Sequence, residues 1–173
     1  MNTLPTISKS EIETASKEPH ELISLLVSRY RDMIMVDSTG QIQHEMTAEQ
    51  NVLMAFDVLD GQVSNGGFIQ LIENGYGSFI FDTPLSEHLR EWGAEKIAAL
   101  IDQARPLYEA NKEVLERKKT LQEFAKMYQE HPEFDALDKE FCEVIDGERG
   151  VIVAYIMGHL EGFVDRIENA DSK

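Results

Sequence analysis

The chain is poor in cysteine and has no long apolar segment. Its single cysteine, Cys142, excludes an internal disulfide. The longest apolar run, residues 151–158, is far shorter than the roughly 18 residues of a membrane-spanning helix. The first residues show no cationic segment followed by an apolar run, the pattern typical of a signal peptide. We therefore expect a cytoplasmic protein without a membrane anchor. At 173 residues and 42% hydrophobic, the chain is large enough to form one domain with its own core.

Lysine and arginine are nearly absent from two stretches of the chain. Residues 32–89 contain nine carboxylates and no Lys or Arg, and residues 127–148 contain eight carboxylates and only Lys139. These two acidic blocks account for the whole net charge of −16, because the remaining residues sum to zero. Such an excess argues against direct binding to nucleic acid or anionic lipid, since both need cations to neutralise phosphate.

Concentrated charge of one sign disfavours a compact fold and attracts partners of the opposite sign. One interpretation is a solvated surface that only keeps the protein soluble. The other is a binding surface for a strongly basic protein, such as one that normally grips nucleic acid. In the second case the candidate partner-binding carboxylates are Asp57, Asp60, Glu73, Asp82, Glu87, Glu130, Glu133, Asp135, Asp138, Glu140, Glu143, Asp146 and Glu148.

The common catalytic and metal-binding motifs are missing. None of the five histidines lies in an H-E-x-x-H motif, and none follows a glutamate by three residues, as the di-metal four-helix pattern requires. Gly75 and Gly77 lack the third glycine and the lysine of a phosphate-binding loop. We expect no catalytic residue, no metal and no cofactor. A hydrolase or metal-dependent enzyme is the third hypothesis, because 32 carboxylates allow pairs at catalytic distance that the sequence does not identify.

Apolar residues recur at helical spacing, so we expect an all-α fold. The pattern predicts a helix over residues 20–36, entered through Pro19, and a second that begins with a capping box at Thr47 and Gln50. Thr83-Pro84 begins a third, which extends past Trp92 to Ile97.

Further along the chain, Pro106 is expected to start or kink a helix that ends near residues 117–119, and Thr120 to cap the next one. After an interruption at Pro132, an acidic helix is expected to end at Asp146-Gly147, with a closing helix up to residue 167. We predict a single compact helical domain of about six to nine helices over residues 16–168. Residues 1–15 and 169–173 are expected to be flexible ends.

The run Ser64-Asn65-Gly66-Gly67-Phe68 is the most unusual local element. Two consecutive glycines tolerate positive φ, so we predict a helix end and a sharp turn into a short helix, with Phe68 packed inside. A functional alternative is that the glycines allow a ligand to approach the backbone closely.

This motif resembles that of a bacterial all-helical domain family, recognised by Asn-Gly-Gly-Phe-x-Gln followed by an aromatic residue and Asn. The matching residues are Asn65, Gly66, Gly67, Phe68, Gln70 and Asn74, while Leu71 replaces the aromatic residue. The resemblance covers about residues 45–165. In length and acidity the chain is similar to a DNA mimic within that family. This resemblance implies a homodimer whose acidic surface imitates duplex DNA and occupies the DNA-binding face of a helix-turn-helix repressor.

The geometry of DNA limits how such mimicry can work. Duplex DNA carries one charge per about 1.7 Å, whereas carboxylates at every fourth helical residue give one per about 6 Å. A mimic must therefore combine several helices or two protomers. The alternative hypothesis is an acidic adaptor or immunity-type protein that binds a basic protein without copying DNA. For the dimer contact, the apolar residues Phe79, Ile80 and Phe81 are the expected candidates.

Overall fold

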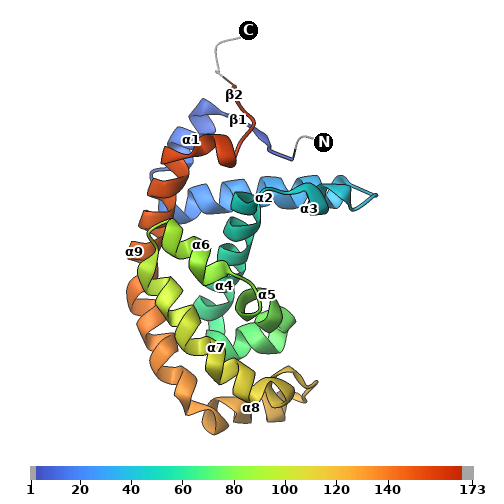
Figure 1. Cartoon of the computed structure of the whole chain (residues 1–173), viewed down its shortest axis with the longest axis vertical. Helices are drawn as coiled ribbons and strands as arrows, with labels where there is room; N and C mark the ends of the chain where they lie inside the picture. Colours follow the sequence, from blue (N-terminus) through green and yellow to red (C-terminus); the bar gives the residue numbers. More distant parts are fainter. Residues whose placement is uncertain (1–2, 169–173) are drawn as a thin grey trace. The chain divides into compact units, whose positions relative to one another are not determined.

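We describe the protein from a computed structural model, which describes residues 3–168. Almost all of this part of the chain is helical, so the all-α prediction is confirmed (Figure 1). The chain divides into two compact units. Unit 1 comprises Met1–Asp57 and Arg149–Lys173, and unit 2 comprises Val58–Glu148. Two long helices, α4 (Ala48–Leu71) and α9 (Asp135–Gly158), contribute residues to both units.

Unit 1 is built from the two ends of the chain. Its elements, besides parts of α4 and α9, are β1 (Thr6–Ser8), α1 (Lys9–Ala15), α2 (Pro19–Val36), α3 (Gln41–Glu45), η3 (Leu160–Gly162) and β2 (Arg166–Glu168). The strands β1 and β2 pair in parallel, with Thr6 opposite Arg166 (Figure 1). The segment expected to be flexible at the N-terminus thus contains a strand and a helix, in which Ile7 and Ile12 are buried. Residues 169–173, the other expected flexible end, lie outside the described residues.

Unit 2 carries the motif and the second acidic block. Its elements, besides parts of α4 and α9, are η1 (Ile72–Tyr76), α5 (Gly77–Phe81), α6 (Leu85–Glu91), α7 (Glu95–Glu116), α8 (Leu121–Glu130) and η2 (Pro132–Phe134). The ring of Phe68 lies at the centre of its core, 6.1 to 6.4 Å between centroids from Phe81, Phe134 and Phe141. All four rings are buried.

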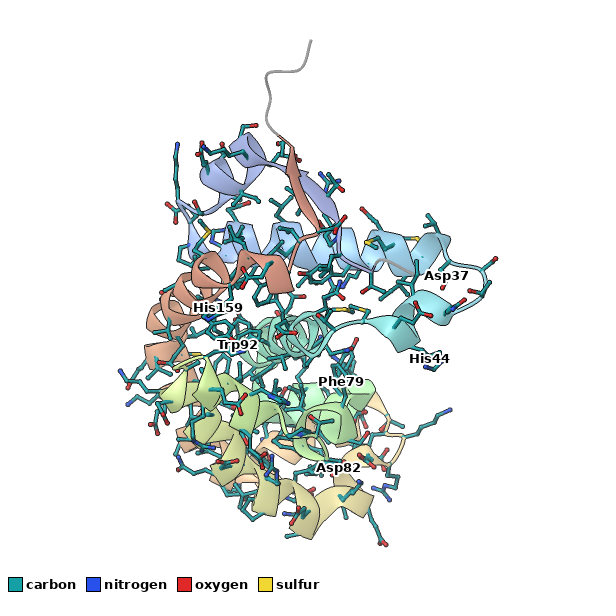
Figure 2. All side chains as sticks on the ribbon, turned by 45° about the horizontal axis from the view of Figure 1, so that its top comes forward. Asp37, His44, Phe79, Asp82, Trp92 and His159 are labelled. Atoms are coloured by element: carbon teal, nitrogen blue, oxygen red, sulfur yellow. The ribbon has the colours of Figure 1, made fainter. Side chains whose placement is uncertain are left out.

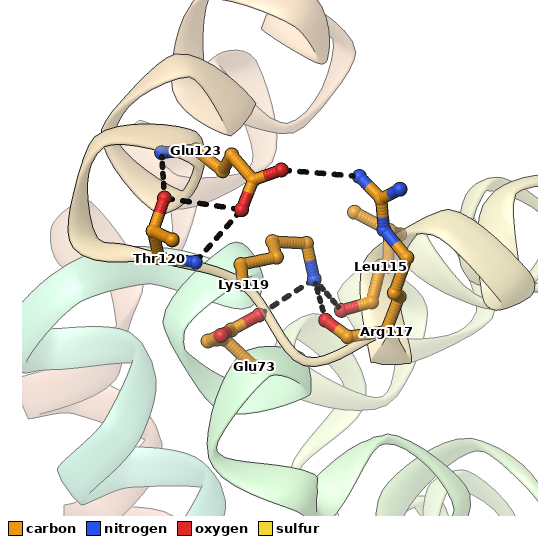
Figure 3. Close-up of polar contacts among 6 residues, drawn as sticks. All are labelled: Glu73, Leu115, Arg117, Lys119, Thr120 and Glu123. Atoms are coloured by element: carbon orange, nitrogen blue, oxygen red, sulfur yellow. Dashed lines mark hydrogen bonds and ion pairs between the residues drawn. The ribbon is translucent and has the colours of Figure 1, made fainter.

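The predicted capping box at Thr47 and the predicted cap at Thr120 are confirmed. The Gln50 N–H donates to Thr47 Oγ1, and the Thr47 N–H donates to Gln50 Oε1, at 3.1 and 3.0 Å. Thr120 and Glu123 form the same reciprocal pair at the start of α8 (Figure 3). Helix α2 also begins at Pro19 as predicted.

Several predicted helix boundaries differ from the structure. The helix predicted through Ile97 ends at Glu91, and Gly93, with a φ of 88°, provides the left-handed turn that separates α6 from α7. Pro106, expected to start or kink a helix, does not start one, because α7 passes through it and Pro106 lies on the exposed side. Helix α9 continues through Gly147, where the acidic helix was expected to end. It ends at Gly158, whereas the closing helix was expected to reach residue 167. The segment that follows instead pairs as β2 with β1, a long-range contact that local periodicity does not reveal.

The expected dimer contact is also changed by the structure. Ile80 and Phe81 are buried in the core of unit 2, and only Phe79 is partly exposed, at 42%. A surface made of all three side chains is therefore not available. No helix within residues 3–168 combines the length and the apolar character that crossing a bilayer requires.

Candidate protein-binding surface

In the first acidic block, residues 32–89, three candidate carboxylates form ion pairs with cations from elsewhere in the chain. Arg31 lies 2.7 Å from Asp57, Lys119 lies 2.7 Å from Glu73, and Lys112 lies 3.0 Å from Asp82. Asp82 directly follows α5, close to the labelled Phe79 (Figure 2). All three cations lie outside residues 32–89, so three of the nine carboxylates in this block have a cationic partner that the local sequence does not contain.

The two other candidates in this block are Asp60 and Glu87. Asp60 accepts a hydrogen bond from the Ser64 hydroxyl at 2.9 Å and is half-buried. Glu87 is exposed in the first turn of α6, and its charge helps to raise the pKa of Arg90, for which the hydrogen bond to Asp102 is the main cause. Three of the five candidate carboxylates in the first block therefore have a neighbouring cation that offsets their charge.

Six of the eight carboxylates of the second acidic block are exposed. We define the acidic row as six exposed carboxylates from the end of α8 through α9: Glu130, Glu133, Asp135, Glu140, Glu143 and Asp146. Between residues 130 and 146 the sequence contains one lysine and no arginine. That lysine, Lys139, is 80% exposed and lies 4.0 Å from Glu143, a separation at which an exposed pair contributes little.

The spacing along α9 sets the length of the row. Asp135 and Asp146 are eleven residues apart, which is about 16 Å along a helix. They lie three turns apart, so both project from the same side of α9. Near the start of the row, Glu133 Oε1 lies 3.0 Å from His131 Nδ1. Burial raises the pKa of Glu133, but the hydrogen bonds from its own backbone N–H and from His131 outweigh burial, so the pKa is lowered.

Glu148 does not belong to this surface, contrary to its prediction as a partner-binding residue. It is only 5% exposed. Its Oε2 accepts hydrogen bonds from the backbone N–H groups of Lys96 and Ile97, at 3.0 and 3.1 Å. These groups begin α7, where a carboxylate satisfies unpaired donors and complements the helix dipole. Glu148 therefore caps α7 from α9, within unit 2.

Asp138 is likewise used inside the protein. It is half-buried, and its Oδ1 accepts a hydrogen bond from the Phe68 N–H at 2.8 Å. Burial raises the pKa of Asp138, the hydrogen bond from Phe68 opposes the rise, and the charge of Asp135 adds to it. The prediction that Asp138 contacts a partner is thus replaced by a structural role beneath the motif.

The glycines of the motif make this contact possible. Gly66 and Gly67 interrupt α4, and Gly67 has a φ of 75°, so the predicted helix end and sharp turn are confirmed. A Cβ on Gly67 would lie 2.2 Å from Asp138 Oδ2. The Tyr128 hydroxyl of α8 donates to the Gly66 carbonyl at 2.8 Å. The turn therefore holds α8 and the start of α9 against the core residue Phe68.

The polar residues of the motif form an amide network beside this turn. Asn65 Nδ2 donates to Gln70 Oε1 at 3.2 Å, and Asn74 Nδ2 donates to Gln62 Oε1 at 2.7 Å. Next to this network lies the buried ammonium of Lys119, bonded to Glu73 (Figure 3). Sequence reasoning did not identify Lys119 or Tyr128, because both reach the motif from about 50 to 60 residues away and nothing local indicates the contact.

Within residues 3–168, no group of three or more His, Cys, Asp or Glu side chains is arranged to hold a metal ion. The candidate site that we describe is a charged surface. Its parts are the acidic row and the amide-lined turn next to it, both in unit 2.

Comparison with known proteins agrees with the resemblance inferred from the motif. The profile of the family described as DMP19-like protein matches residues 44–159. The chain is also 32% identical over 155 residues to DNA mimic protein DMP19 of Neisseria meningitidis serogroup B, an alignment that covers 85% of this chain and 89% of the relative. The matched region includes the motif, the amide network and the acidic row.

Proposed function

Because the chain belongs to the DMP19-like family, we propose that it is a DNA mimic. In this proposal the acidic row binds the DNA-binding surface of a helix-turn-helix transcriptional repressor in the cytoplasm. Repressor molecules held in this way do not bind operator DNA, so repression is relieved. The observation that carries the proposal is the acidic row itself, six exposed carboxylates between residues 130 and 146, a stretch that contains one lysine and no arginine.

The other candidate carboxylates have smaller parts in this proposal. Asp57, Glu73 and Asp82 are paired with Arg31, Lys119 and Lys112. Their partners reduce the potential that a repressor would meet at these positions. Glu130, Glu133, Asp135, Glu140, Glu143 and Asp146 are therefore the residues that we assign to the contact.

A single row supplies fewer charges than DNA does. Over about 16 Å of axis, duplex DNA carries roughly ten phosphate charges, against the four carboxylates of α9 in the row. A homodimer presents the row twice, which brings the count closer to that of one DNA-binding site. We therefore include a homodimer in the proposal, as the same family resemblance implies.

Reversing charges in the row tests the proposal. Helix-turn-helix proteins captured from a lysate of the source bacterium at low salt are first purified, and their displacement from labelled operator DNA is followed by fluorescence anisotropy. The double substitution Glu140→Lys and Glu143→Lys is expected to weaken displacement at least about tenfold, or about 1.4 kcal/mol. Both residues are exposed, so the fold is expected to tolerate the change.

A matched control separates position from net charge. Glu109 and Glu113 are exposed on α7 in the same unit, and Glu109→Lys with Glu113→Lys changes the net charge by the same amount. This control is expected to retain most of the displacement. Equal losses in both variants would mean that the row has no special part in binding.

The alternative is an acidic adaptor that binds a basic protein without copying DNA. The exposed acidic row suits either function, so the two are distinguished by competition. A mimic and operator DNA exclude each other on the repressor, whereas an adaptor forms a ternary complex. A stable complex of repressor, operator and this protein in a gel-shift experiment would favour the adaptor.

A further inference from the structure

An open cavity of about 420 Å³ lies in unit 2 between the motif and the start of α8. It is lined by Asn65, Glu73, Asn74, Lys119 and Phe124, and the side chain of Lys119 is itself buried. Leu121, at the start of α8, also lines it and is 84% exposed. The proposed charge mimicry does not explain this cavity, although the motif that identifies the family lines it.

The hydrogen-bond donors at the cavity are largely used by the protein itself. The ammonium of Lys119 has three protons, and it lies 2.7 Å from each of three acceptors, which are Glu73 Oε2 and the carbonyls of Leu115 and Arg117 (Figure 3). At the start of α8, the capping box engages the N–H groups of Thr120 and Glu123. The carboxylate of Glu123 also adds negative charge there. An anionic ligand such as a phosphate would therefore find few donors and an opposing charge.

Acceptor atoms, by contrast, remain available. Asn65 and Asn74 use their amide nitrogens in the network with Gln70 and Gln62. Among the hydrogen bonds within residues 3–168, none engages Asn65 Oδ1, Asn74 Oδ1 or the second carboxylate oxygen of Glu73. The cavity thus combines unused oxygens with an aromatic wall at Phe124.

A planar cation with several donors matches this set of groups. Guanidinium carries five N–H donors in one plane and stacks on aromatic rings, whereas a lysine ammonium is a compact and strongly hydrated charge. We propose that the cavity binds the guanidinium group of an arginine side chain from the basic protein partner. The inference rests on the proposed function for the source of that arginine, because an acidic surface attracts arginine-rich surfaces.

The position of the cavity gives it a role in specificity. Phe68 and Gly66 tie the motif to Asp138 of α9 and Tyr128 of α8, so the cavity and the acidic row belong to the same unit. The row attracts any basic surface. A cavity that accepts one guanidinium group selects partners with an arginine at the matching position.

A titration with a small arginine compound tests the cavity without any repressor. Nα-acetyl-L-arginine N-methylamide is added to the isotope-labelled full chain and followed by NMR. Saturable shifts are expected for the side-chain amides of Asn65 and Asn74 and for the methyl groups of Leu121. The corresponding acetyl-lysine compound, which has the same charge, is expected to bind at least fivefold more weakly, and methyl phosphate is expected not to shift these signals.

Two variants and one control complete the test. Phe124→Leu and Asn74→Ala are each expected to raise the Kd of the arginine compound at least fivefold. Circular dichroism verifies that each variant is folded. Phe79→Leu removes a partly exposed aromatic ring elsewhere in unit 2 and is expected to change nothing. Equal binding of the arginine and lysine compounds, shifts confined to the acidic row, or full binding by both folded variants would overturn the proposal. Failure here leaves operator displacement by the row unaffected, so the two proposals fail separately.

Discussion

At the residue scale, Asp138 combines a burial cost with a specific hydrogen bond. Its carboxylate is half-buried beneath the motif and accepts the Phe68 N–H at 2.8 Å. Burial nevertheless outweighs that bond and raises the pKa of Asp138 above its ordinary value of 3.8. The protein therefore tolerates an unfavourable charge at the point where the turn meets α9.

This imbalance predicts a pH dependence of stability. Because the pKa is higher in the folded than in the unfolded protein, the folded state binds this proton more tightly, and ionisation of Asp138 costs stability as the pH rises through the folded pKa. Asp138→Asn keeps an acceptor for the Phe68 N–H without the charge. We expect the variant to gain free energy of unfolding relative to the wild type between pH 4 and pH 7, measured by urea denaturation at each pH. If the free energy of unfolding of the variant instead falls relative to the wild type as the pH rises, the charged hydrogen bond to Phe68 outweighs the cost of burial.

At the element scale, α7 depends on a carboxylate from another helix. Glu148 of α9 accepts the N–H groups of Lys96 and Ile97, while Ala94, the residue at the cap position of α7, makes no side-chain cap bond. Glu148→Gln removes the charge and brings an amide NH₂ group close to these donors. We expect a loss of about 1 to 2 kcal/mol in the free energy of unfolding, measured by urea denaturation at pH 7.

The control for this loss lies on the exposed side of the same helix. Glu140→Gln removes an equal charge and is expected to change the free energy of unfolding by less than about 0.5 kcal/mol. Equal effects of the two substitutions would mean that net charge, and not the cap on α7, accounts for the change.

The elements also show which parts of the fold sequence alone could predict. The capping boxes at Thr47 and Thr120 involve residues three positions apart, so the sequence contains the whole interaction. Pro106 was expected to start or kink a helix and Gly147 to end one, but α7 and α9 pass through these residues, because tertiary packing overrides their low helix propensity. The parallel pairing of Thr6–Ser8 with Arg166–Glu168 joins the two ends of the chain, and nothing local predicts it.

At the scale of the whole molecule, counting charges along the sequence predicted only part of the candidate surface. Both acidic blocks were expected to contribute. Three carboxylates of the first block are paired with Arg31, Lys112 and Lys119, which lie outside it in sequence but adjacent in space. Six of the eight carboxylates of the second block stay exposed because they lie opposite the buried apolar face, whereas Asp138 and Glu148 bond to groups inside the protein. Unit 2 still holds 19 carboxylates against nine lysines and arginines, a net charge of −10, so its field remains strongly negative.

The density of this charge predicts how salt affects competition with DNA. Counterions condense on duplex DNA because its charges are about 1.7 Å apart, and their release makes repressor binding steeply dependent on salt. The carboxylates of the acidic row are farther apart, so fewer counterions are released when a repressor binds them. We therefore expect log Kd to change less steeply with log salt concentration for this protein than for operator DNA.

Added salt is therefore expected to make this protein a better competitor against operator DNA, although salt weakens both complexes. As NaCl is raised from 50 to 200 mM, both complexes weaken, but the operator complex weakens more. With labelled operator in trace amount and repressor at one fixed concentration, well above its Kd for operator at both salt concentrations, the concentration of this protein needed to displace half of the operator is expected to fall relative to its value at 50 mM, as measured by anisotropy. The Glu140→Lys and Glu143→Lys variant is expected to show a still shallower slope, because it has fewer charges to screen. A slope equal to that of DNA would indicate that the bound surface is as densely charged as a duplex, which one acidic row on α9 does not provide.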